Sequence, residues 1–169
     1  AGGPDYLAGL NADLHCNFTP EYPLTIRSHD LNNRVTVKVP DVAFNLFYLR
    51  NVVIEGINFE GSGQGYNRAL YGAWHDLIGR TDNITVKKCK FVNTPTDRLV
   101  GMEGMGDGLI VENCIFYSTN NSDSYRCINQ SFGGNKYKLY NNTVIGGWRY
   151  FVLVTSLSGM EMANNVVIG

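Results

Sequence analysis

The sequence has little of several features that identify common classes of protein. Charged residues make up only 17% of the 169 residues, and the formal net charge is −1. A nucleic-acid-binding domain usually carries a strongly basic face, so nucleic acid is not an expected partner. No apolar run reaches the roughly 18 to 20 residues that a membrane-spanning helix needs. The sequence therefore predicts a chain without a membrane span.

The chain also lacks helical periodicity and paired cysteine spacing. Apolar residues do not recur at helical spacing beyond a turn or two, whereas short apolar segments bounded by Gly, Asn, Asp and Ser recur throughout. The 19 glycines favour tight corners over long helices. The four cysteines show no metal-ligand spacing, so zinc and haem are not expected. They are Cys16, Cys89, Cys114 and Cys127.

An internal repeat is the strongest feature that the sequence does contain. Five segments align without gaps and start 23 to 32 residues apart. In each segment the second and fourth residues are apolar, so they point to one side of a strand, and the pattern resumes at the seventh and ninth positions. The sixth residue is Gly, Lys or Asn, which predicts a corner with left-handed backbone. The segments are 51–59, 83–91, 108–116, 136–144 and 159–167.

A strand, a corner, a second strand and a variable loop describe one coil of a parallel β-helix. The sequence predicts an all-β fold, a right-handed single-stranded parallel β-helix of about five to six coils, complete or truncated. Residues 1–21 would form a lead-in or first coil, and 22–169 the coils, with a surface insertion at 61–80. Asn142 and Asn165 share an inward column and are expected to form a hydrogen-bonded ladder. A further strand before each repeat is predicted at 44–49, 75–78, 97–100, 125–128 and 149–154.

The runs 22–28 and 42–61 resemble the opening coils of pectate-lyase-like right-handed β-helix proteins, especially those of the alginate lyase and chondroitinase B type. The resemblance covers most of 22–169 and implies the fold. The superfamily includes lyases, glycosidases, phage tailspikes, adhesins and scaffolds, so an activity has to be argued from a site. The polygalacturonase motifs Asn-Thr-Asp, Asp-Asp, Gly-His-Gly and Arg-Ile-Lys are absent, and no lyase motif is found.

Arginines and aromatic residues in the predicted additional strands form one candidate site. A lyase that acts on a uronate needs a cation to neutralise the carboxylate and a base to remove a carbon-bound proton. Arg98 and Arg126 are predicted at equivalent positions of neighbouring coils, with Asp76 in the coil before and Tyr150 in the coil after. The candidate catalytic residues are Arg98, Arg126, Tyr150 and His75. A solvated charge ladder explains the same pattern.

The insertion at 61–80 supplies candidate substrate contacts. Insertions in a solenoid collect on its surface, and aromatic rings stack well on sugar rings. Tyr66, Tyr71 and Trp74 are the candidates in this segment, and Arg149 joins them from a later coil. The alternative is a loop that packs its own aromatic residues against the solenoid.

A column of oxygen-bearing side chains suggests a calcium site. Asp82, Asp107 and Asn135 each stand one residue before a repeat, and Glu103 lies just ahead of Asp107. Ca²⁺ binds carboxylate and amide oxygens of this kind, so calcium is the one cofactor that the sequence suggests. Turn formation explains the same residues, because Asp and Asn hydrogen-bond their own backbone at strand entries.

Five Asn-x-Ser/Thr sequons favour a secreted or cell-surface protein. They begin at Asn17, Asn83, Asn120, Asn129 and Asn141. Cys89 and Cys114 fall in one inward column, and buried free thiols are expected there rather than a disulfide.

Three functions remain open at this point. The first is an extracellular β-helix module that is structural or binds a polysaccharide. The second is a lyase or hydrolase that acts on an acidic glycan. The third is a subunit of a surface fibre or tailspike that self-associates through uncapped solenoid ends.

Overall fold

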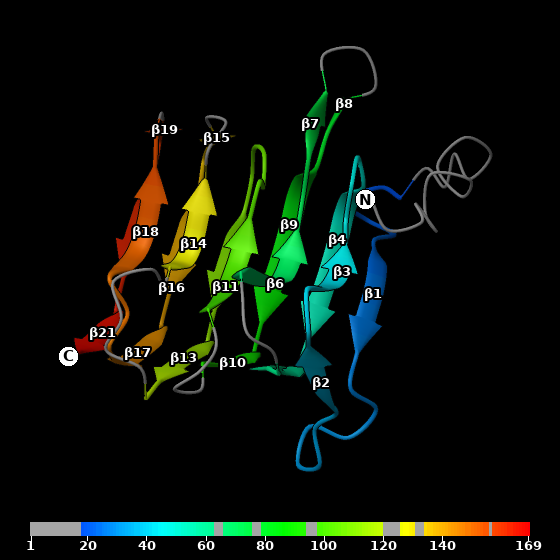
Figure 1. The fold of residues 1–169 in the computed structure, drawn as a ribbon. Coiled ribbons are helices and arrows are strands. Elements are labelled where there is room, and N and C mark those ends of the chain that lie inside the picture. Colours follow the sequence, from blue (N-terminus) through cyan, green and yellow to red (C-terminus); the bar gives the residue numbers. More distant parts are fainter. Residues whose placement is uncertain are drawn as a thin grey trace.

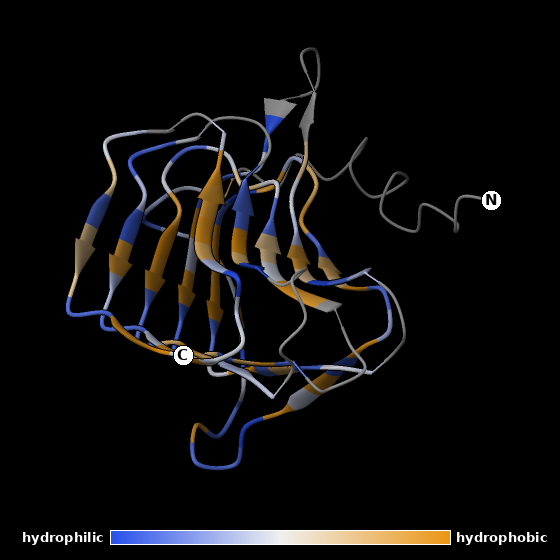
Figure 2. Cartoon of the chain, turned by 60° about the vertical axis from the view of Figure 1, so that its left-hand side comes forward, coloured by the Kyte–Doolittle hydropathy of each residue, from blue (hydrophilic) through white to orange (hydrophobic). Residues whose placement is uncertain are grey.

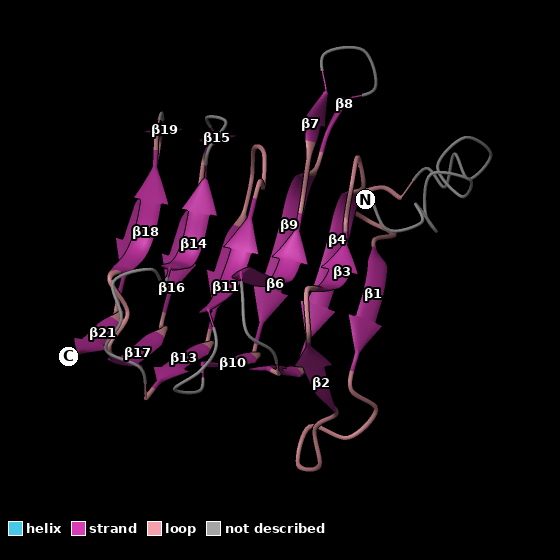
Figure 3. Cartoon of the chain, in the orientation of Figure 1, coloured by secondary structure: helices cyan, strands magenta, loops and turns pink. Residues whose placement is uncertain are grey.

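The computed structural model describes residues 18–62, 66–75, 79–93, 98–119, 126–130, 134–155 and 157–169. These residues form strands and turns and no helix, as Figure 3 shows. Accordingly, the described part of the chain has no helix long and apolar enough to cross a membrane.

Three parallel sheets form the sides of the molecule (Figure 1). Sheet A contains β1 (Leu24–Arg27), β4 (Arg50–Glu55), β9 (Asp82–Lys87), β12 (Ile110–Glu112), β16 (Lys138–Tyr140) and β20 (Glu161–Ala163). Sheet B contains β2 (Thr36–Val39), β5 (Asn58–Gly61), β10 (Lys90–Asn93), β13 (Ile115–Ser118), β17 (Thr143–Gly146) and β21 (Val166–Ile168). Sheet C contains β3 (Val42–Asn45), β6 (Tyr66–Tyr71), β11 (Arg98–Glu103), β14 (Arg126–Gln130) and β18 (Tyr150–Val154).

The chain passes through sheets A, B and C in turn, and this order repeats. The strand order gives five complete coils followed by β20 and β21 of a sixth. Two short pairs lie beside the coils: β7 (Trp74–His75) pairs antiparallel with β8 (Gly79–Arg80), and β15 (Gly134–Asn135) pairs parallel with β19 (Leu157–Ser158). The predicted parallel β-helix of about five to six coils is confirmed.

The repeat alignment predicted the register of sheets A and B. Ile84 pairs with Val52, and Ile110 pairs with Thr85 on one side and with Lys138 on the other. The sixth position of every segment has positive φ, between 54° and 68°, which confirms the predicted left-handed corner between sheets A and B. These residues are Gly56, Lys88, Asn113, Asn141 and Asn164.

A second left-handed position was not predicted. The first residue of every aligned segment also has positive φ, between 54° and 75°. In these five repeats, a left-handed residue therefore lies at the start of the sheet A strand or just before it, and another follows the strand's end. The pattern was present in the sequence, because four of these five residues are Asn or Gly, the types that best tolerate this conformation. They are Asn51, Asn83, Gly108, Lys136 and Gly159.

The core consists of inward columns that run from coil to coil. The rings of Phe59 and Phe91 stack at 5.2 Å between centroids, and those of Phe91 and Phe116 at 4.8 Å. All three are fully buried. Figure 2 shows hydrophobic segments in orange along the strands of successive coils.

The seventh-position column carries polar side chains into this core. Asn142 Nδ2 donates to Asn165 Oδ1 at 3.0 Å and to the carbonyl oxygen of Val111 at 2.9 Å, so the predicted amide ladder is confirmed. Cys89 and Cys114 occupy the same column as buried free thiols, also as predicted. The Cys89 thiol contacts the carbonyl oxygen of Ile54, and the Cys114 thiol contacts that of Val86. Each carbonyl lies in the preceding coil, at the repeat position that Val111 occupies for Asn142.

The inward residues of the last coil are exposed. Met160 and Met162 are 42% and 46% exposed, and Val167 is 63% exposed, although their counterparts in earlier coils are buried. Another coil in register would cover them. Self-association through this surface stays a prediction.

The prediction that 75–78 forms the third strand of its coil is wrong, and residues 76–78 lie outside the described residues. The third strand of the second coil is β6, which pairs with β3 and β11, and only the residues after it depart from the coil as β7 and β8. Asn67 is 1% exposed and points inward. Because a polar residue takes an inward position of β6, the apolar alternation that would predict this strand is interrupted. The segment 61–80 is therefore only partly a surface insertion.

Candidate functional site

The outer face of sheet C is the part of the solenoid where arginine and tyrosine side chains gather. Arg68 pairs with Val100 of the next coil, and Arg126 pairs with Tyr150. Met102 pairs with Ile128, so continuing this register places Arg126 level with Val100. One row across the sheet therefore reads Arg68, Val100, Arg126 and Tyr150. Val100 is fully buried in this row although it is not part of the inward core cluster.

A bend in sheet C explains why its strands present apolar residues in pairs. Ala69 and Leu70 are both buried, as are Cys127 and Ile128 two coils further along. The ladder between β6 and β11 pairs residues on both sides of Ala69 but not Ala69 itself. After the bend, the alternation between inward and outward residues is shifted by one, so Tyr71 and Glu103 face outward with Arg68.

Glu103 is the centre of the polar cluster on this face. One carboxylate oxygen, Oε1, accepts hydrogen bonds from the Tyr66 hydroxyl at 3.0 Å and from Asn129 Nδ2 at 2.6 Å. The other, Oε2, accepts a hydrogen bond from Nε of Arg68 within an ion pair. The four residues come from β6, β11 and β14, so the cluster ties three coils together.

Arg68 is held on every side within this cluster. Its guanidinium carbon lies 4.5 Å from the centre of the Tyr66 ring and 4.6 Å from that of Tyr71. Asp41 adds a second, well-exposed carboxylate at 3.9 Å. Stacking of arginine on aromatic faces and pairing with a carboxylate both restrict the side chain. Arg68 is therefore fixed in position, and its charge is compensated within the protein.

Tyr66 stays protonated at neutral pH. Burial raises the pKa of its hydroxyl, and the negative charge of Glu103 and the hydrogen bond to it raise the pKa further. Asn129 and the positive charge of Arg126 act in the opposite direction. The net upward shift keeps Tyr66 as a hydrogen-bond donor to Glu103, which makes it unsuited to accept a proton from a substrate.

Arg126 occupies a different electrostatic position from Arg68. Its Nε is buried and has no hydrogen-bond partner, and among the described residues no carboxylate forms an ion pair with it. Next to it, the guanidinium of Arg149 lies 5.3 Å from the centre of the Tyr150 ring. This end of the face therefore carries positive charge together with an aromatic ring.

Six of the predicted site residues meet on this face. They are Tyr66, Tyr71, Glu103, Arg126, Arg149 and Tyr150. The predicted equivalence of Arg98 and Arg126 is wrong, because Arg98 pairs with Tyr66 and lies two positions away along the strand. The prediction failed because it aligned Val100 with Ile128, whereas Ile128 pairs with Met102, which follows the bend.

The remaining predicted catalytic and substrate residues lie beside the coils or outside the described residues. Trp74 and His75 form β7, which leaves the coil and pairs with β8. Their side chains, like that of Arg98, lie outside the described part, as does Asp76.

The predicted calcium ligands form a column at the entry of sheet A, with one exception. Asp82 Oδ1 accepts the backbone N–H of Asp107 at 2.9 Å, and Asp107 Oδ1 accepts that of Asn135 at 3.0 Å. Asp107 also lies 3.6 Å from the guanidinium of Arg80. Glu103 belongs to the sheet C cluster instead. Among the described residues no group of three or more His, Cys, Asp or Glu side chains could hold a metal ion. The hydrogen bonds of the column run from one coil to the next, and not to each residue's own backbone as the turn interpretation expected.

The sequons differ in accessibility. Asn129 is 4% exposed and its Nδ2, the atom that a glycan would modify, donates to Glu103 and Tyr66. Modification of Asn129 therefore conflicts with the folded structure. Asn83 and Asn141 are exposed, whereas Asn17 and Asn120 lie outside the described residues.

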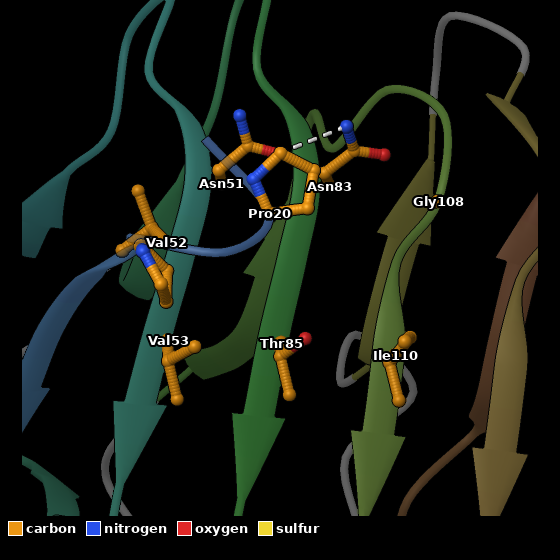
Figure 4. A pocket seen from close by; sticks show the side chains of 9 residues that line it. Pro20, Asn51, Val52, Val53, Asn83, Thr85, Gly108 and Ile110 are labelled. Atoms are coloured by element: carbon orange, nitrogen blue, oxygen red, sulfur yellow. Dashed lines mark hydrogen bonds between the residues drawn. The ribbon is translucent and has the colours of Figure 1, made fainter. Parts of the chain in front are cut away.

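A hollow of about 300 Å³ lies on the outer face of sheet A, not at the sheet C cluster (Figure 4). Val53, Thr85 and Ile110 line its floor, and Pro20 and Pro23 cover one side. Asn83 Nδ2 donates to Asn51 Oδ1 at 3.1 Å at its upper edge. None of the lining residues titrates, so this hollow supplies no acid or base.

Sequence reasoning missed Arg68, Val100 and the role of Asn129 in the site. The spacing of 32 residues between Arg68 and Val100 equals that between the first and second repeats, and this periodicity could have identified β6. The sequence predicts Asn129 only as a sequon.

No protein-family model, curated protein or solved structure matches the chain. The parallel β-helix is therefore shown by the structure itself.

Proposed function

We propose that the chain is an extracellular β-helix module that binds polysaccharide along the outer face of sheet C. The observation that carries the proposal is the convergence of Tyr66, Tyr71, Arg126, Arg149 and Tyr150 on this face. Tyrosine rings and arginine guanidinium groups supply the flat apolar surfaces and hydrogen-bond donors that a sugar ring requires. The resemblance to pectate-lyase-like proteins and the exposed sequons support an extracellular location.

The shape of the face favours a polymer as the guest. Parallel strands repeat at about 4.8 Å, so side chains of successive coils form rows that run along the solenoid. The ties between Glu103 and three coils make the face rigid before a guest arrives, which lowers the entropic cost of binding. A glycan chain that lies across the coils would contact several rows at once.

The bonding within the cluster supports binding rather than catalysis. The two oxygens of Glu103 are engaged by Tyr66, Asn129 and Arg68, and Tyr66 holds its own proton. A β-elimination needs a base that is ready to accept a proton from carbon. The cluster is instead arranged as a preformed surface.

Binding to a panel of soluble polysaccharides tests the proposal. The chain would be titrated calorimetrically with polygalacturonate, alginate, chondroitin sulfate and xylan, while ultraviolet absorbance records any unsaturated uronate. We expect binding of at least one polymer without a rise in absorbance. Tyr150→Ala on sheet C should weaken that binding at least tenfold.

Tyr117→Ala is the matched control, because Tyr117 is a tyrosine on β13 of sheet B and is 37% exposed. It should bind as the wild type does. Failure of the wild-type chain to bind every polymer, or equal losses in the two variants, would overturn the proposal. A rise in absorbance that disappears in Arg126→Ala would make the protein a lyase.

A further inference from the structure

The two arginines of the outer row on sheet C have different roles. We infer that Arg126 selects a guest with an acidic group, carboxylate or sulfate, whereas Arg68 is a fixed structural element of the face. The inference rests on the proposed glycan binding at this face and adds the chemical class of guest and the residue that recognises it.

Charge compensation separates the two side chains. Arg68 pairs with Glu103 and lies 3.9 Å from Asp41, and Tyr66 and Tyr71 cover its guanidinium group. An acidic guest at Arg68 would have to displace Glu103, which Tyr66 and Asn129 also hold in place. Arg68 therefore offers little attraction to an added negative charge.

Arg126 has no such compensation among the described residues. Its Nε is a buried donor without an acceptor, and a buried donor in this condition raises the free energy of the unliganded protein. Because Nε is enclosed, a guest would meet the uncompensated charge of the guanidinium group and not this atom. Arginine binds carboxylate and sulfate through two parallel hydrogen bonds, so an anionic oxygen pair is the best match to the group.

The surroundings of Arg126 place a sugar ring beside such an acid. Tyr150 is the residue paired with Arg126 on the next strand and supplies an aromatic ring there. The exposed guanidinium of Arg149 stacks on Tyr150 and adds positive charge at the rim. Exposed charges are screened by salt, so Arg149 is expected to contribute less than Arg126.

The test compares polygalacturonate with its fully methyl-esterified form, which has the same sugar backbone without the negative charge. Chondroitin sulfate against unsulfated chondroitin separates recognition of sulfate from recognition of carboxylate. We expect the wild-type chain to prefer an acidic polymer to its uncharged or less charged partner by at least tenfold. Arg126→Gln should abolish the preference, so that the variant binds the acidic polymer no better than the esterified one.

Two further variants distinguish selection of charge from a structural effect. Arg126→Lys should restore part of the preference, because it restores the charge without the bidentate geometry. Glu103→Gln removes the compensation of Arg68 and should increase affinity for the acidic polymer severalfold. Circular dichroism would confirm that each variant has the β-sheet spectrum of the wild type.

Each outcome decides between the two proposals. If the wild-type chain binds no polymer, glycan binding itself fails. If it binds but does not distinguish charged from esterified polymer, or if Arg126→Gln keeps the preference, the role of Arg126 is refuted while glycan binding stands.

Discussion

The buried amide of Asn142 provides a strong test of how the solenoid core is held together. Its Oδ1 accepts the backbone N–H of Cys114 at 3.0 Å, and its Nδ2 donates to the carbonyl oxygen of Val111 at 2.9 Å. Asn142 is fully buried, so water cannot replace either partner. We expect Asn142→Leu to destabilise the chain, although leucine is apolar and similar in size.

The magnitude follows from the groups that lose their partner. The N–H of Cys114 becomes unsatisfied, at a cost of about 1 to 3 kcal/mol. The Val111 carbonyl, which lies in the sheet A ladder, and Asn165 Oδ1 each lose one hydrogen bond, worth about 0.5 to 1.5 kcal/mol. Leucine buries additional apolar surface, which offsets about 1 to 2 kcal/mol of this cost. The expected net decrease in the free energy of unfolding is therefore about 2.5 kcal/mol, a large part of the roughly 5 to 15 kcal/mol typical of a domain.

Urea unfolding followed by circular dichroism measures this difference. Cys89→Val is the matched control, because Cys89 lies in the same column, where Ile57 shows that a branched apolar side chain is accepted. The control should lose less than about 1.5 kcal/mol. A loss in Asn142→Leu below about 1 kcal/mol, or no greater than that of the control, would refute the reasoning. If Asn142→Leu does not fold, the same comparison applies to the half-buried Asn165, whose Nδ2 donates to the Leu139 carbonyl at 2.8 Å.

Three further predictions concern the corners, the thiols and one ion pair. Asn113 has φ of 55°, so Asn113→Val should lower the free energy of unfolding by about 1 to 2 kcal/mol in urea titrations and Asn113→Gly should not; equal effects would exclude a conformational cause. The buried thiols of Cys89, Cys114 and Cys127 should react with a thiol reagent at least about 100-fold more slowly in the native chain than in denaturant, and rapid native reaction would contradict their burial. Lys88 and Lys87 lower the pKa of Glu55 below 4.5, so its stabilising contribution is present above that pH and is lost as the pH falls through the lowered pKa. Glu55→Gln should therefore reduce the acid sensitivity of the thermal midpoint, and an unchanged pH profile would contradict the assignment.

Sheets A and B were predictable because each coil specifies them locally. Apolar residues at the second and fourth positions define the strand of sheet A, and a left-handed residue two positions later defines the corner. The signal is carried within nine consecutive residues and then recurs in the next coil. Stacking in register requires only that neighbouring coils repeat the same pattern, which the sequence shows directly.

Sheet C was less predictable because its strands break the two-residue period. Ala69 and Leu70 both point inward, and Asn67 places a polar residue in the core. An alignment that requires regular alternation therefore assigns residues after the bend to the wrong face. This error explains why Arg98 was aligned with Arg126 and why β6 was interpreted as part of an insertion.

The electrostatic character of the candidate site depends on contacts that no local pattern contains. Arg68 and Glu103 are 35 residues apart, yet their ion pair decides which arginine remains available to a guest. In the sequence, Arg68 and Arg126 are equivalent as cations, and the composition around them does not separate their roles. Only the register of β6 against β11 brings Glu103 beside Arg68. The positive charge of Arg126 is left without a carboxylate partner among the described residues. Glu103→Gln, which removes the negative charge beside Arg68, therefore tests the fold and the site together. If the register of β6 against β11 were wrong, the substitution would not change the surroundings of Arg68, and the affinity for an acidic polymer would stay the same.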